Sequence, residues 1–247
     1  MRKNKGIILN CFSPPVMVAT FCIEIALAAY TLWRYKMTHL ARLFMLTLIC
    51  LAGFQLSEYH VCTGYGSATI PWSRAGFVLI TALPALGIHI IHKLGGIKDR
   101  KLVYAAYATM AAFMITFLTY HAAFIGHQCT GNYVIFQLGP TVGGLYGLYY
   151  YAWLFIGIVL AGFLANRLME KGKSNHNKVL TLRAMIIGYL VFLVPVATAM
   201  MIKPETRRGI PSIMCGFAVI FALILTLYIL PRSGELKDGS PAKRKHS

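Results

Sequence analysis

Seven long apolar runs occupy most of this chain of 247 residues. They cover residues 16–33, 43–59, 75–91, 102–120, 145–165, 184–202 and 210–230. A helix needs about 20 apolar residues to cross a bilayer, within a range of about 17–25. In lipid, every backbone polar group must be satisfied within such a segment, which favours helices. The runs therefore predict an all-α integral membrane protein, a seven-transmembrane-helix bundle that crosses the cell membrane several times.

Composition excludes the two other classes with long apolar segments. Charged residues make up only 13% of the chain, about half the share that soluble domains carry. The runs also lack the amphipathic period of helices that form a soluble core. Strands of a membrane barrel would be about half as long and would alternate polar with apolar residues.

The chain reads as one membrane domain with short ends. We expect an extracytoplasmic segment at 1–15, the helical domain at 16–230, and a disordered basic cytoplasmic tail at 231–247, since the tail is rich in charge, Pro, Gly and Ser. The apolar stretch 6–12 is too short for a cleaved signal peptide. The first span is therefore expected to act as an uncleaved anchor.

Basic residues predict the orientation. Of the 24 Lys and Arg, 17 fall on one alternating set of loops and 7 on the other. Cytoplasmic loops carry the excess of positive charge, so the N-terminus is predicted outside and the C-terminus inside. The formal net charge of +17 is expected to attract anionic lipid headgroups on the cytoplasmic side. A nucleic-acid partner is not expected, because the short basic tail lacks a folded binding module.

Two cysteines on the predicted outer side open the same tripeptide, Cys-Thr-Gly, at Cys62 and at Cys129. Disulfides persist outside the cytosol, so we predict a Cys62–Cys129 bridge. Two free thiols, or a pairing of Cys11 with either residue, are the alternatives. The bridge would attach the long loop 121–144, which is unusually apolar, to the second span. We expect this loop to fold back over the helix ends as a cap.

Polar residues within the spans are candidates for function, because ionisable groups in a bilayer are costly. Glu24 lies inside the first span and is a candidate proton or ion site, either protonated or hydrogen-bonded to a side chain such as Gln55. Gln55 and Glu58 are three residues apart and share a helical face. Glu58 is expected either to pair with Arg74 or to contact a ligand.

Aromatic residues form a stripe at the start of the fifth span, at Tyr146, Tyr149, Tyr150 and Trp153. Their spacing places them on one helical face. Such a stripe is typical of the aromatic belt at a membrane interface. It also suits a pocket for an apolar or cationic ligand.

Histidines offer a further possibility on the outer side. His60 and His121 end the second and fourth spans at the same height, and His127 follows in the long loop. Together they would suit a metal or haem site, with zinc needing a third ligand. Histidine at a headgroup boundary is more typical of an interfacial residue with a polar tip. No cofactor is predicted.

Three motifs carry a family resemblance. They are Trp72-Ser73-Arg74-Ala75-Gly76-Phe77 leading to Pro84, Gly139-Pro140 before the tyrosine-rich span, and Ile210-Pro211 at the last span. In these the chain resembles the N-terminal seven-helix membrane sensor region of bacterial histidine kinases, without the kinase. The resemblance implies a ligand-sensing module whose output lies in a separate membrane or cytoplasmic partner.

The leading functional prediction is a non-enzymatic, receptor-like bacterial protein that senses a small or apolar ligand from the outer side. Its expected ligand-binding residues are Gln55, Glu58, Arg74, His121, Tyr149 and Trp153. The first alternative is a proton- or ion-coupled small-solute transporter that uses Glu24. The second is a metal- or haem-dependent membrane enzyme or redox carrier that uses His60 and His121.

Overall fold

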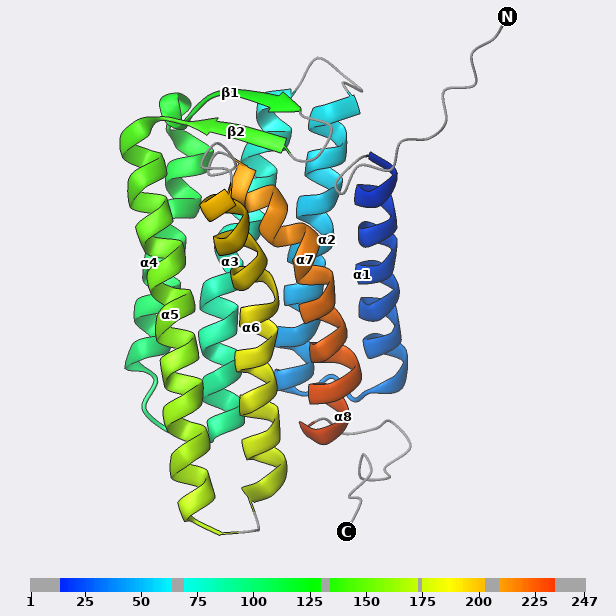
Figure 1. Cartoon of the computed structure of the whole chain (residues 1–247), viewed down its shortest axis with the longest axis vertical. Coiled ribbons are helices and arrows are strands. Elements are labelled where there is room, and N and C mark those ends of the chain that lie inside the picture. The colour runs from blue at the N-terminus through cyan, green and yellow to red at the C-terminus, as the bar shows by residue number, and fades with distance from the viewer. Residues whose placement is uncertain (1–13, 64–68, 130–133, 173–174, 203–208, 234–247) are drawn as a thin grey trace, which may run out of the picture.

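The computed structural model describes residues 14–63, 69–129, 134–172, 175–202 and 209–233. Within them, seven long helices run side by side as one bundle (Figure 1). They are α1 (Pro14–Arg34), α2 (His39–Thr63), α3 (Thr69–Gly95), α4 (Lys101–Thr119), α5 (Pro140–Glu170), α6 (His176–Ile202) and α7 (Ile210–Leu223). The helix of α7 continues through η4 (Ile224–Ile229) into α8 (Leu230–Ser233).

Each of these seven units is long and apolar enough to cross a bilayer, so the chain is a multi-pass membrane protein. Large apolar side chains, such as Trp33 at 74% exposure, stand on the outside of the bundle. A water-soluble monomer rarely exposes a continuous apolar surface, whereas lipid covers such a surface without cost. The predicted seven-helix bundle is confirmed to this extent.

The helices extend beyond the predicted apolar runs. α5 begins at Pro140, five residues before its run, with proline in the first helical turn, where its missing N–H costs nothing. Parts of the two predicted end segments, 1–15 and 231–247, are also helical: Pro14 and Pro15 belong to α1, and residues 231–233 belong to α8. The predicted end segment and tail otherwise lie outside the described residues, as does Cys11.

Helix α3 occupies the centre of the bundle and packs against α2, α4, α5 and α6, while α1 packs at the edge against α2 and α7. Close approach depends on small residues at helix contacts, as is usual in membranes. Tyr189 of α6 fills the space beside two of them, Gly87 of α3 and Gly157 of α5. Pro84 and Pro195 lie inside α3 and α6, which continue on both sides.

The loop between α4 and α5 contains a structure that the all-α prediction lacked. After the short helix η1 (His121–Ala123), strands β1 (Phe124–Cys129) and β2 (Val134–Leu138) pair antiparallel. This hairpin lies across one end of the bundle (Figure 1) and packs on α2, α3 and α7. The predicted cap is confirmed. Its backbone forms strands because the pairing of β1 with β2 supplies the backbone hydrogen bonds that a helix would otherwise provide.

The last span is not a regular α-helix. In η4, a π-helical segment, the N–H of Leu230 donates to the carbonyl of Leu225, five residues earlier. Such segments are rare in α-helices and often occur near functional sites. The Thr226 hydroxyl in this segment is buried without a hydrogen-bond partner among the described residues.

Candidate functional site

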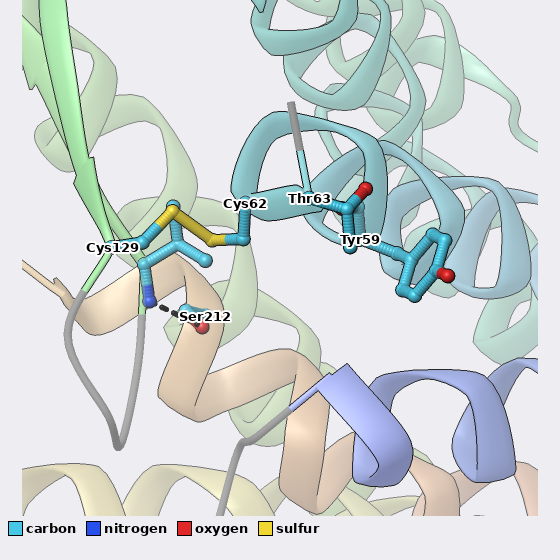
Figure 2. Close-up of a disulfide and its surroundings, with 6 residues drawn as sticks. Tyr59, Cys62, Thr63, Cys129 and Ser212 are labelled. Carbon is cyan, nitrogen blue, oxygen red and sulfur yellow. Dashed lines mark hydrogen bonds between the residues drawn. A yellow bond between two sulfur atoms is a disulfide. The ribbon is translucent and has the colours of Figure 1, made fainter. Parts of the chain in front are cut away.

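The hairpin is fastened to two helices. A disulfide joins Cys129, at the end of β1, to Cys62, near the end of α2 (Figure 2). The predicted Cys62–Cys129 bridge is therefore confirmed. At the start of β2, the N–H of Val134 donates to the hydroxyl of Ser212 in α7 at 3.1 Å, the dashed line in Figure 2. The hairpin thus forms a roof over the helix ends, attached to α2 and α7.

Arg74 of α3 supports the base of this roof. Its guanidinium donates to the carbonyl oxygens of Leu118 at 3.1 Å and His121 at 3.4 Å. The predicted Glu58–Arg74 pair is wrong. Arg74 lies on the side of α3 that faces α4, where the last carbonyls of a helix lack partners within the helix, whereas Glu58 faces α7.

A cavity of about 460 Å³ lies beneath the roof. Most of its walls are apolar or aromatic, and they come from α3, the hairpin, α5 and the start of α7. The lining residues are Phe77, Ile80, Ile125, Ile135, Phe136, Gln137, Leu138, Gly143, Tyr146, Gly147, Tyr150, Tyr151, Ile210, Pro211, Met214 and Cys215. Its volume falls in the range of about 300–1,000 Å³ that is typical of small-molecule sites.

The predicted tyrosine stripe divides between two roles. Tyr146 and Tyr150 line the cavity. Tyr149 and Trp153 are not among its lining residues: the Tyr149 hydroxyl donates to the Thr81 carbonyl at 2.7 Å, and the Trp153 indole donates to Thr109 at 2.9 Å. The four residues share one broad face of α5. One edge of this face lines the cavity, and the other contacts the neighbouring helices α3 and α4.

Most of the cavity wall was not predicted from the sequence. Gln137 and the α7 residues from Ile210 to Cys215 were not among the candidates, although the apolar loop and the Ile210-Pro211 motif were noted for other reasons. An apolar loop that folds back over the helix ends must cover an apolar surface. The apolar character of this loop was therefore the available sequence signal for a cavity beneath it. Of the predicted ligand contacts, Gln55, Glu58, Arg74 and His121 do not line this cavity either.

A second polar group lies apart from the cavity, between α1, α2 and α7. Glu24, Gln55 and Glu58 are 0%, 2% and 1% exposed. Both carboxylate oxygens of Glu24, Oε1 of Glu58 and the amide nitrogen of Gln55 lack hydrogen-bond partners among the described residues. The predicted Glu24–Gln55 hydrogen bond is therefore wrong. The Ser212 hydroxyl forms a side-chain hydrogen bond with Glu58, and Glu24 and Glu58 are close enough for charge interaction.

His60, His121 and His127, all near the hairpin end of the bundle, have separate contacts. His60 stacks on Trp72 with ring centroids 4.2 Å apart, and the Nδ1 atom of His121 lies 3.4 Å from the Arg74 guanidinium. His127 belongs to β1. Among the described residues, no group of three or more His, Cys, Asp or Glu is placed to hold a metal ion.

No protein-family model and no curated protein matches this chain. The proposals below therefore start from the cavity, the roof and the buried carboxyl groups.

Proposed function

We propose that this protein is a receptor-like membrane protein, not an enzyme, which binds a small apolar molecule in the cavity beneath the hairpin. The observation that carries the proposal is the cavity itself: it has the volume of a small-molecule site and a roof held by a disulfide. Apolar walls with a few polar groups are typical of such sites. Here Gln137 and the tyrosine hydroxyls would orient the ligand.

Access is expected from the lipid. Tyr151 of α5 and Ile125 of the hairpin line the cavity and are 37% and 67% exposed, so the cavity wall extends to side chains that are not enclosed by the bundle. A ligand dissolved in the membrane can therefore reach the site without leaving an apolar phase, which favours apolar ligands over hydrophilic ones.

Signalling would run along α7. The start of this helix lines the cavity, and its continuation through η4 and α8 reaches the opposite end of the bundle (Figure 1). A ligand that binds one position of α7 better than another shifts the population between them. The resemblance to sensor regions of bacterial histidine kinases supports an output in a separate membrane or cytoplasmic partner.

Filling the cavity tests this proposal. A Cβ at Gly147, which lines the cavity, meets no atom within 4 Å, so Gly147→Leu places a side chain in ligand space without a clash at its root. In nanodiscs with a diazirine-bearing fatty acid, we expect photolabelling of α5 and α7 to fall about tenfold, the equivalent of ~1.4 kcal/mol of binding.

Gly144→Leu is the matched control, because its Cβ is equally free and Gly144 does not line the cavity. Both variants gain the same helix propensity. Peptide mapping locates the label. Equal labelling of wild type and both variants, or labelling spread over all lipid-facing helices, would overturn the proposed site.

We also propose that the hairpin end faces outward and the C-terminus lies in the cytoplasm of the cell membrane. The support is the 17-to-7 division of basic residues and the disulfide at the hairpin end, which suits an oxidising compartment. Green fluorescent protein fused after Ser247 is expected to fluoresce, and alkaline phosphatase at the same point is expected to be inactive. The reverse pattern would invert the topology.

A second candidate function is proton- or ion-coupled transport of a small solute. The observation in its favour is Glu24, fully buried in a membrane-spanning helix and without a hydrogen-bond partner among the described residues. It would be supported if proteoliposomes accumulate solutes from a labelled amino-acid and sugar mixture under an imposed pH gradient, and lose this accumulation in Glu24→Gln.

A further inference from the structure

Two buried carboxyl groups on neighbouring helices lack a basic partner among the described residues. Glu24 comes from α1 and Glu58 from α2, and both are at most 1% exposed. They interact with each other through their charges, and the Cys215 thiol of α7 interacts with both. Three helices that pack on one another, α1, α2 and α7, therefore direct titratable groups to one place.

The surrounding side chains leave these carboxyl groups unsatisfied. The Thr20 and Thr31 hydroxyls of α1 donate to carbonyls of their own helix. On α3, which packs against α2, Thr81 donates to Phe77 and Arg74 is directed to the end of α4. Neither Glu24 nor Glu58 has a Lys, Arg or His partner among the described residues, and Ser212 serves only one of the four carboxyl oxygens.

The amide of Gln55 gives an independent sign that something binds here. Gln55 lies one turn before Glu58, on the same face of α2. It is 2% exposed, and its side-chain nitrogen has no hydrogen-bond partner among the described residues. A buried donor without a partner is destabilising, so this amide is available to hydrogen-bond to an occupant of the site.

Two ionised carboxylates in this position would repel each other in a medium that solvates charge poorly. Buried carboxyl groups that interact in this way do not both ionise, so at least one of them keeps its proton. A metal ion would relieve the same repulsion, but the described residues gather no group of three or more His, Cys, Asp or Glu for one. A proton needs no such ligand set.

We propose that Glu24 and Glu58 form a proton-binding site in which the pair retains at least one proton at neutral pH, with the Ser212 hydroxyl bonded to Glu58 and the Gln55 amide beside it without a partner among the described residues. The site is independent of the proposed ligand cavity. The two are nevertheless adjacent, because Cys215 lines the cavity and also interacts with both carboxyl groups. Loss of the proton would place two negative charges against the first turns of α7, so proton binding and the position of α7 are linked.

Infrared spectroscopy tests this directly. The chain has only 7 Asp and Glu residues, so the spectrum in the carboxylic-acid region is simple. In a maltoside detergent, which has no carbonyl group of its own, we expect at pH 7 a protonated-carboxyl C=O band that shifts on exchange into D₂O. The band should disappear in the double variant Glu24→Gln/Glu58→Gln, whose side chains are isosteric and neutral. Glu170→Gln, at the other end of the bundle, is the control and should leave it unchanged.

Each alternative outcome overturns the proposal. Absence of the band at pH 7 in the wild type would mean that both groups are ionised, and sodium binding measured with ²²Na in the same sample would then identify a cation as the occupant. A band that persists in the double variant would belong to another residue. Folding of the variants is checked by helical circular dichroism and gel filtration, and the single variants Glu24→Gln and Glu58→Gln replace the double variant should it fail to fold.

Discussion

Loss of the Cys62–Cys129 disulfide is expected to destabilise the protein by about 2–4 kcal/mol and to release the roof of the cavity. The bridge closes a loop with a sequence separation of 67 residues, and cross-links over long loops restrict the unfolded chain most. Membrane helices persist in the unfolded state in detergent, so part of this restriction is already present. The effect is therefore expected in the lower half of the range.

The measurement is unfolding in sodium dodecyl sulfate, followed by circular dichroism, for Cys62→Ala, Cys129→Ala and the double variant. Cys22→Ala is the control, because Cys22 is a free cysteine on the outside of α1. Limited proteolysis should cut the α4–α5 connection in the three disulfide variants before any other segment. Equal stability and equal proteolysis in all the variants would show that the hydrogen bond from Val134 to Ser212 and the packing of the strands hold the roof alone.

Gly188→Ala is expected to destabilise the protein by disrupting the contact between α6 and α7. A Cβ at Gly188 would lie 2.4 Å from Cδ2 of Phe221, close to the root of that ring. Phe221 cannot rotate freely, because it packs between Tyr189 and Phe192 with centroid distances of 5.6 and 5.9 Å. Overpacking of this kind costs about 1–3 kcal/mol, and here it would separate α6 from α7.

Gly162→Ala provides the comparison within a membrane-spanning helix. A Cβ there meets only Cδ1 of Ile186, at an ordinary 3.9 Å. Both variants gain the same helix propensity, up to about 1 kcal/mol, so the difference between their unfolding free energies isolates the packing term at Gly188. Equal stability of the two variants would mean that Phe221 moves aside at no cost, and that the contact between α6 and α7 is loose.

The sequence was sufficient for the helices because the length of an apolar run is set by the bilayer and does not depend on neighbours. It also allowed the disulfide to be predicted, since Cys62 and Cys129 both fall on one side of the membrane. The two strands were missed because segments of 6 and 5 residues in an apolar loop have no periodicity long enough to distinguish strand from coil.

The residues that make up the site were harder to predict from the sequence, because they depend on how each helix is rotated about its axis. Chain spacing placed Glu58 and Arg74 at the same height, but Arg74 faces α4 and Glu58 faces α7. The same difficulty applies to Glu24: the sequence allowed Gln55 as its partner, on the face of α2 that also carries Glu58, but not the charge interaction of Glu24 with Glu58 itself. For Tyr146 and Tyr149, the stripe was correctly identified, and only the packing of α3 and α4 determines which of the two reaches the cavity.

The π-helical segment η4 acts as a one-residue insertion in the last span. One additional residue turns everything after it by about 100° relative to a regular helix. Its presence lets the hairpin end of α7 direct Ser212 toward the roof and Cys215 toward Glu58, while Leu225, Ile229 and Leu230 still enter the main core. The two halves of this span can therefore each face their own packing partners. Deletion of a single residue in this segment would rotate one half of the span away from its packing partners. In η4, the number of residues is therefore expected to matter more than which residues they are.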